Sequence, residues 1–105
     1  MARFEVYANR GANRHVAPYL VDVQSEFLEG LTTTVVVPLI REEEHPGKRL
    51  PRDLVPGFEI SGIRCVFYPP FIGAITTREL GEHVASLREE GNSLIAALDR
   101  LTRGF

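Results

Sequence analysis

The chain has 105 residues, of which 44% are hydrophobic and 25% are charged, and its formal net charge is −2. This length predicts one domain over residues 1–105, with a modest core that needs neither metal nor disulfide. A net acidic charge argues against a protein that binds nucleic acid through its phosphates, so we expect no direct sequence-specific nucleic-acid partner.

The sequence also lacks the usual features of exported and membrane proteins. No apolar run approaches the roughly 18 residues that a membrane-spanning helix needs. Met1–Phe4 leads straight into strand-like alternation, without the apolar core of a signal peptide, and the lone Cys65 cannot form an internal disulfide. We therefore expect a cytoplasmic protein with no membrane partner.

The first half of the chain predicts three β-strands. A short strand over Phe4–Tyr7 is followed by a polar loop, Ala8–Pro18. Tyr19–Ser25 alternates apolar and polar residues as a half-buried strand does, and Thr32–Ile40 is β-branched almost throughout. Pro38 has no N–H to donate, which predicts a sheet edge or a bulge at that end of the third strand.

Asp22 is an unexpected residue inside the second strand, because Asp is disfavoured in strand interiors. A carboxylate that leans inward without partners costs a few kcal/mol. We therefore expect Asp22 to be structural, accepting hydrogen bonds from backbone or hydroxyl donors.

The second half predicts a long loop, further strands and a terminal helix. Arg41–Arg52 reads as a loop, and Phe58–Ile60 and Ile63–Tyr68 flank Ser61-Gly62, a plausible hairpin turn. Phe71–Thr77 is the last predicted strand.

Two capping boxes, Thr76 with Glu79 and Ser86 with Glu89, offer alternative starts for the helix. The second start leaves fewer glycines inside, so we expect a helix over 87–102, stopped by Gly104. Short antiparallel strands with one C-terminal helix predict a mainly β fold of the SH3-like, partly open barrel type.

Residues suited to catalysis or metal binding do not form a convincing set. Glu42–Glu44 and His45 read as a solvated charge run, and His83, near Glu79 and Glu82, as a surface residue that could pair with one of them. Cys65 lies in an apolar strand and reads as a buried, inert thiol. We find no phosphate-binding Gly loop and no Ser-centred elbow. We expect no catalytic residue, no metal site and no cofactor.

Several segments, in order along the chain, resemble the CcdB family, the toxins of bacterial CcdA/CcdB-type toxin–antitoxin systems. The most specific is Val21-Asp22-Val23-Gln24-Ser25, which resembles the second strand of these proteins. The others are Phe4–Tyr7, Val35–Leu39, Leu54–Pro56, Leu80–Leu87 and Gly104-Phe105. The resemblance implies the CcdB/MazF-like barrel, a homodimer, and a type II toxin that poisons DNA gyrase without catalysis of its own.

In this family, the terminal helix and the residues after it bind the gyrase A subunit. The family pattern is a Trp-Gly-Ile end, with a Glu one turn into the helix and an Asn near its last turn. The matching positions, and the expected gyrase-binding residues, are Gly91, Asp99, Arg103, Gly104 and Phe105. Only the Gly is kept. Arg103 replaces a Trp that can stack on an Arg of the target as a cation–π pair. The positive charge of Arg103 would instead repel that Arg. Arg nevertheless also stacks well and is common at interface hot spots.

The resemblance assigns two further surfaces. The dimer interface would contain Phe27, Leu28, Asp99 and Phe105, with a locally buried bulge as the alternative for the first two. The polar loops match regions that receive the disordered antitoxin CcdA in the family. Their arginines Arg10, Arg14, Arg41 and Arg49 would suit an acidic partner, with plain solvated loops as the alternative.

Two rival functions stay open. One is a CcdB-fold protein that keeps its dimer and antitoxin but has lost or changed the gyrase target. The other is a MazF-like endoribonuclease, with Arg10, Arg14, His15 and Asp22 as its charged set. The net acidity fits RNA cleavage poorly, since a nuclease favours a basic groove with stacking aromatic residues.

Overall fold

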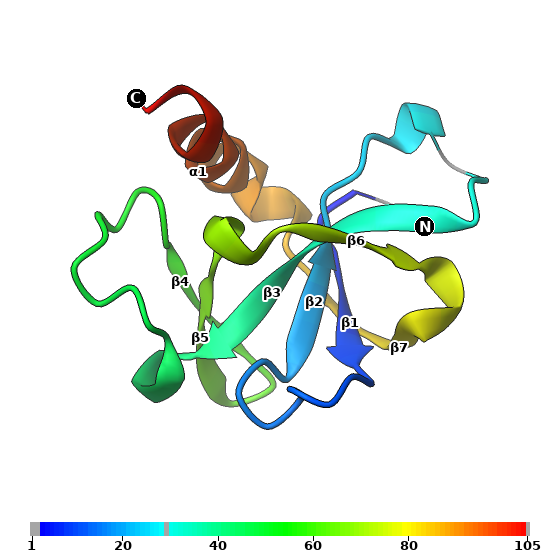
Figure 1. Cartoon of the computed structure of the whole chain (residues 1–105), viewed down its shortest axis with the longest axis horizontal. Helices are drawn as coiled ribbons and strands as arrows, with labels where there is room; N and C mark the ends of the chain where they lie inside the picture. The colour runs from blue at the N-terminus through cyan, green and yellow to red at the C-terminus, as the bar shows by residue number, and fades with distance from the viewer. Residues whose placement is uncertain (1–2, 29, 105) are drawn as a thin grey trace.

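The computed structural model describes residues 3–28 and 30–104. Within this part of the chain, seven strands form one curled antiparallel sheet, and one α-helix follows them (Figure 1). The strands are β1 Glu5–Asn9, β2 Tyr19–Asp22, β3 Thr33–Arg41, β4 Gly57–Ile60, β5 Ile63–Phe67, β6 Gly73–Thr76 and β7 Leu80–Ser86, and the helix is α1 Gly91–Arg103. The mainly β, partly open barrel predicted from the sequence is confirmed.

The sheet curls around β3. The strand order is β4-β5-β3-β2-β1-β7, and β6 also pairs with β3. β2 pairs with residues 36–39 of β3, while β6 pairs with 33–36 and β5 with 39–41. β6 and β5 thus pair with successive parts of the same edge of β3. The sheet bends between these two pairings.

Pro38 lies at this changeover, inside the central strand. The predicted sheet edge or bulge at Pro38 was therefore wrong, because this residue lies inside a central strand. The reason behind the prediction still holds, since Pro38 has no N–H to donate to a neighbouring strand. Pro38 pairs with Leu20 of β2 and accepts a hydrogen bond from Tyr68 N at 3.1 Å. Its missing N–H falls between the last pair with β6, at Val36, and the first pair with β5, at Leu39, where no ladder bond is lost.

The two faces of β2 and β3 are both partly buried. Val21, Val37 and Leu39 face the main core, where Leu94 and Ala97 of α1 pack against them. The alternate residues face the other side, where smaller apolar clusters include Leu20 with Val36 and Leu80, and Ile40 with Tyr68 and Val66. This two-sided burial explains why β3 is apolar almost throughout instead of alternating.

The hairpin between β4 and β5 is confirmed. Ser61 and Gly62 both have positive φ, 50° and 83°, as a type I′ turn requires, and Ile60 pairs with Ile63 across it. The second strand, by contrast, ends at Asp22 instead of continuing to Ser25. The Asp22 side chain accepts a hydrogen bond from Gln24 N at 3.0 Å, and this local turn leads the chain out of the ladder.

β7 was not predicted from the sequence, and it pairs with β1 at the margin of the sheet. Gly81 is required there because a Cβ at this position would lie 2.8 Å from Ala8 O. The Thr76–Glu79 capping box does form, but it caps only the single 3₁₀ turn Thr77–Glu79 between β6 and β7. The predicted strand Phe71–Thr77 correspondingly shortens to β6.

The terminal helix begins later than predicted, at Gly91 instead of residue 87, after a 3₁₀ turn over Arg88–Glu90. Ser86 ends β7 and donates its hydroxyl to Glu5 Oε2 at 2.6 Å, so it forms no capping box with Glu89. The predicted stop is confirmed. Gly104 has the left-handed φ of 80°, and its N–H bonds to Arg100 O at 3.0 Å.

Candidate functional site

The residues that the resemblance assigns to target binding lie at both ends of α1. Gly91 opens the helix, whereas Asp99, Arg103 and Gly104 lie in its last turns or just beyond. At 1.5 Å per residue, Gly91 and Arg103 are about 18 Å apart along the axis. Phe105 lies outside the described residues. The described tip therefore consists of Asp99, Arg103 and Gly104, with Gly91 as a separate contact point.

Arg100, which was not predicted as a site residue, links the helix tip to the body of the molecule. Its Nε lies 3.3 Å from Asp53 Oδ2, and its Nη1 donates to Gly104 O at 3.0 Å. A cation in the last turn also complements the helix dipole. The position of Arg100 in this turn is the sequence feature from which its role could have been predicted. Arg103 itself is exposed. Arg103 is thus exposed in a helical turn whose Arg100 contacts both Asp53 and Gly104.

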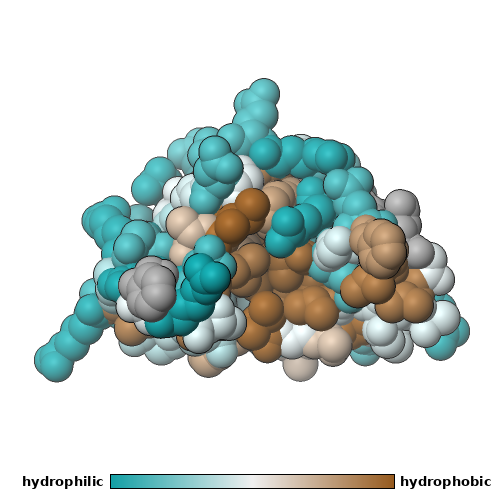
Figure 2. Space-filling model, turned by 90° about the horizontal axis from the view of Figure 1, so that it is seen from above, coloured by the Kyte–Doolittle hydropathy of each residue, from teal (hydrophilic) through white to brown (hydrophobic). Residues whose placement is uncertain are grey.

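An apolar surface lies on the same side of the molecule as the helix. Phe27 and Leu28, in the 3₁₀ turn η1 (Glu26–Leu28), are 93% and 44% exposed. Both η1 and α1 stand at the upper side of Figure 1, and Figure 2, seen from above, shows apolar surface gathered between hydrophilic margins. The locally buried bulge considered for Phe27 and Leu28 is therefore excluded.

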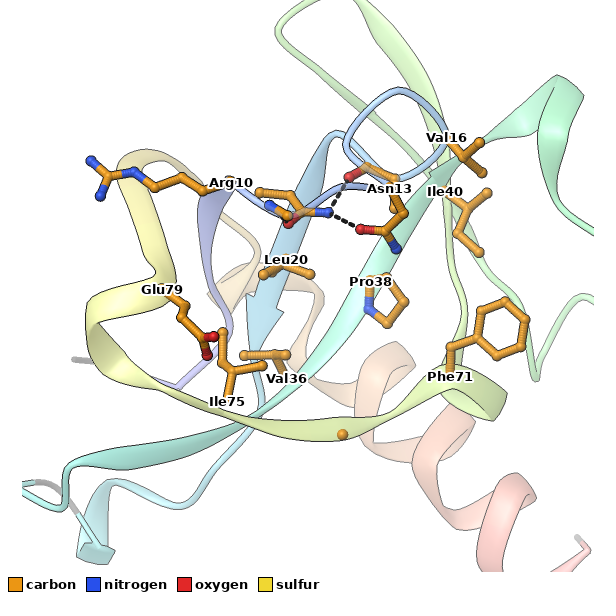
Figure 3. Close-up of a pocket in the computed structure, with 14 residues that line it drawn as sticks. Arg10, Asn13, Val16, Leu20, Val36, Pro38, Ile40, Phe71, Ile75 and Glu79 are labelled. Carbon is orange, nitrogen blue, oxygen red and sulfur yellow. Dashed lines mark hydrogen bonds between the residues drawn. The ribbon is translucent and has the colours of Figure 1, made fainter.

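Three of the four arginines assigned to antitoxin binding cluster around the loop between β1 and β2. Arg14 Nη1 donates to Gly11 O at 3.2 Å, and Arg41 Nε donates to His15 O at 2.9 Å. Arg10 extends away from the cavity beside it (Figure 3). Arg49 is exposed in the other loop. Arg41 thus brings the start of the second loop against the first.

A pocket of about 640 Å³ lies beneath the first loop, on the sheet face opposite the main core (Figure 3). Asn9 holds the loop over it, with Nδ2 donating to Asn13 Oδ1 at 3.0 Å and to Ala17 O at 2.7 Å. Its floor is apolar and includes Leu20, Val36, Pro38, Ile40 and Ile75, while Arg10 and Glu79 lie at its rim. This pocket was not predicted from the sequence, although the apolar residues at alternate positions of β2 and β3 indicated a second apolar face of the sheet.

Asp22 has the structural role that was predicted. It is only 2% exposed, and its Oδ1 accepts hydrogen bonds from Thr34 Oγ1 at 2.9 Å and Gln24 N at 3.0 Å. It lines a second pocket, whereas Arg10 lines the first. The charged set imagined for a nuclease is therefore not assembled, because Asp22 lies at the far end of β2 from the loop that carries Arg14 and His15.

The most catalytic-looking cluster joins β1 and β7. Glu5 Oε1 lies 2.6 Å from His83 Nε2, and Glu5 Oε2 accepts the Ser86 hydroxyl at 2.6 Å. Burial raises the pKa of Glu5, but the hydrogen bonds from Ser86 and His83 outweigh it, so the pKa is lowered overall. The carboxylate separates the hydroxyl from the imidazole, which is the wrong order for activating a serine. His83 thus pairs with Glu5 and not with Glu79 or Glu82.

Cys65 is the second candidate for reactivity that the sequence offered. Cys65 is buried, and burial raises the pKa of its thiol to about 11, so it is the inert thiol that was predicted.

Within residues 3–28 and 30–104, no group of three His, Cys, Asp or Glu side chains lies close enough together to hold a metal ion. In the same part of the chain, no helix has the length and apolar character needed to cross a membrane.

Comparison with known families gives one match. A family model described as CcdB protein matches residues 3–104, which is almost the whole chain. No curated protein matches it. The matched region includes β1, the whole sheet and α1 up to the Gly104 cap.

Proposed function

The chain belongs to the CcdB family, and we propose on this premise that it is the toxin of a type II toxin–antitoxin pair that inhibits DNA gyrase. The proposed contact is between the gyrase A subunit and α1 with its tail, through Gly91, Asp99, Arg103, Gly104 and Phe105. The observation that carries the proposal is the family match over residues 3–104, which includes this helix and its Gly cap.

The local geometry of the tip supports this role. Arg103 is exposed, Gly104 turns the chain through a left-handed conformation, and Arg100 braces the turn against Asp53. A braced tip loses little conformational freedom when it binds, and this favours affinity. Action by binding, without catalysis, cofactor or metal, fits the buried Cys65 and the unsuitable order of the Ser86, Glu5 and His83 side chains.

The proposal includes a homodimer formed through Phe27, Leu28, Asp99 and Phe105. A phenylalanine that is 93% exposed is costly to leave in water, and a two-fold contact would bury two copies of it together. The apolar surface in Figure 2 is of the kind that such a contact would cover.

The proposed antitoxin is CcdA-like, with an acidic segment that meets Arg10, Arg14, Arg41 and Arg49. Arg14 and Arg41 are positioned by loop carbonyl groups at 3.2 and 2.9 Å, which orders their side chains before any partner arrives. A disordered segment could wrap around such loops.

The altered tip favours one rival within the same class, a family member whose target is no longer gyrase. Arg103 stands where the family has Trp, and Gly91 where it has Glu. The nuclease rival is weaker, because Asp22 and Arg10 line different pockets. Purified protein should leave single-stranded RNA intact, and cleavage that disappears in Arg14→Ala or His15→Ala would establish the nuclease instead.

The test is gyrase-dependent DNA cleavage, with a gyrase matched to the Trp-bearing family members. Wild type should poison it weakly, and Gly91→Glu with Arg103→Trp should restore poisoning. Gly91 has helical backbone angles, and a Cβ there would lie 3.4 Å from the Phe4 ring, so a side chain can be accommodated. The control, Gly91→Gln with Arg103→Trp, has the same bulk without the charge and should fall between the two.

Two outcomes would change the proposal. Strong poisoning by the wild type would mean that Arg103 and Phe105 form a working substitute surface for Trp and Ile. Inactivity of both wild type and the restored variant, with the dimer intact, would count against gyrase as the target.

A further inference from the structure

The loop that follows β3 packs against Tyr68, which lies between β5 and the 3₁₀ turn Pro69–Phe71. Tyr68 is only 5% exposed, and its ring meets the His45 ring with 6.2 Å between the two centroids. Gly47 is buried, and a Cβ there would lie 2.8 Å from Tyr68 Cε1, so the loop backbone lies directly on this ring. We call residues 45–50 the His45 loop.

Hydrogen bonds and apolar packing give the His45 loop a defined position. Lys48 Nζ donates to Glu42 O at 2.6 Å, and Leu50 N donates to Gly47 O at 3.0 Å. The Leu50 side chain also packs on the apolar cluster that contains Tyr68. The loop is therefore held by its own backbone contacts and by one aromatic ring of the body.

One ring nitrogen of His45 lies in this packed region without a partner. Within the part of the chain that the structure describes, His45 Nδ1 is buried and has no hydrogen-bond partner. A neutral imidazole carries its single proton on one nitrogen, whereas an imidazolium carries a proton on both. Protonation would thus place a charged N–H donor in a buried position without an acceptor, which is costly. The packed loop fits the neutral ring.

Burial and neighbouring charges both act on the protonation of His45. Burial opposes the charged ring most strongly, and the Lys48 ammonium adds to this effect. Glu42 acts in the opposite direction, but its Oε1 also lies 3.5 Å from Nη2 of Arg64 on β5. A phenol is uncharged at acidic pH, so Tyr68 does not offset the added proton. The pKa of His45 is therefore lowered from its ordinary value of 6.5.

We propose that protonation of His45 releases the His45 loop from Tyr68, so that the loop is packed at neutral pH and open at acidic pH. Because packing disfavours the protonated ring, the packed state is fully stable above about pH 6.5. It loses stability as the pH falls from there to the pKa of the packed ring.

This inference rests on the proposed function only for its consequence. Arg49, one of the proposed antitoxin contacts, lies in the His45 loop. An open loop must be ordered again when a partner binds, and this ordering opposes binding. Acidification should therefore weaken the contact between the antitoxin and Arg49, whereas the release of the loop itself needs no antitoxin.

The test is an NMR titration of the purified chain from about pH 8 to about pH 4.5, followed through the amide signals of Gly47, Lys48 and Leu50. We expect one transition that the three amides share, with a midpoint below 6.5. On its acidic side, Leu50 should lose at least about threefold of its protection against amide exchange, corrected for the intrinsic pH dependence, because its bond to Gly47 O opens.

His45→Gln keeps a polar side chain that cannot be protonated, so its loop should stay packed over the whole range. If this variant is open at every pH, His45→Phe keeps a ring on Tyr68 without a titratable group and should stay packed. His15→Gln is the matched control, because it removes an exposed histidine from the other loop and should leave the transition unchanged.

Three results would overturn the proposal. They are a wild type whose three amides show no shared transition, a transition that persists in both His45 variants, and a transition that disappears in His15→Gln. None of these results depends on gyrase or antitoxin. Failure of the gyrase test would likewise leave the loop transition in place, so the two proposals can fail separately.

Discussion

Glu5 on β1 and His83 on β7 form an ion pair, with 2.6 Å between Oε1 and Nε2, across two strands whose residues are 78 positions apart. The Glu5 side chain is only 14% exposed, whereas that of His83 is 52% exposed. Hydrogen bonds from Ser86 and His83 outweigh burial, so the pKa of Glu5 lies below its ordinary value of 4.5. This carboxylate therefore links the stability of the β1–β7 pair to pH.

Because folding lowers the pKa of Glu5, its contribution to the free energy of unfolding is complete above about pH 4.5 and is lost as the pH falls through the folded-state pKa. Glu5→Gln should destabilise the protein by about 0.5 kcal/mol at pH 7 and by less at pH 2.5. Urea unfolding at both values measures this. Glu82→Gln, an exposed change on the same strand, is the control, and an equal loss at both values for Glu5→Gln would contradict the prediction.

Asp22→Ala should lower the free energy of unfolding by about 1–3 kcal/mol, because the Thr34 hydroxyl and the Gln24 amide lose their acceptor. Asp22→Asn should cost less, since it keeps the Oδ1 acceptor. Denaturant unfolding of the two variants measures the difference. An unchanged midpoint for Asp22→Ala would show that these hydrogen bonds contribute nothing net.

Gly81→Ala should destabilise the protein by about 1–3 kcal/mol, because the new Cβ would lie 2.8 Å from Ala8 O and 2.9 Å from Ala8 Cβ. The strand pair must separate to make room. Gly73→Ala is the matched control in β6, where a Cβ would meet no atom within 4 Å. Thermal unfolding should show a clear loss for the first variant and almost none for the second.

The protein should be a homodimer at tens of micromolar, and Phe27→Asp should weaken the dimer at least tenfold while leaving the fold intact. A buried charge in place of a buried aromatic ring opposes association. Phe71→Asp makes the same change at another exposed phenylalanine, 56% exposed, and should remain dimeric. Light scattering and circular dichroism measure the two properties, and a monomeric wild type would rule this interface out.

The parts of the fold that were predicted from the sequence are those with strong local signals. Ser61-Gly62 specifies its hairpin because a positive φ is needed at both positions, and Gly104 specifies the helix end in the same way. Asp22 was predicted to be structural because Asp is disfavoured inside a strand and therefore needs compensating hydrogen bonds.

The parts that were missed depend on distant contacts. β7 carries Gly81, Glu82 and His83, and its pairing is stabilised by β1 rather than by its own composition. The late helix start follows from the hydrogen bond between Ser86 and Glu5, 81 positions away. The pockets depend on which faces of β2 and β3 stay uncovered, and this is decided by the position of β6.

The pairing of β1 with β7 has a consequence for the order in which the protein is made. The first strand gains this partner only when residues 80–86 have left the ribosome, and α1 follows immediately after them. Pairings this distant are closed late because loop closure costs entropy before any contact compensates for it. The helix that carries the proposed toxic contact can therefore be seated only after β7 has been made, and a chain released before residues 80–86 would lack both this strand pair and the helix.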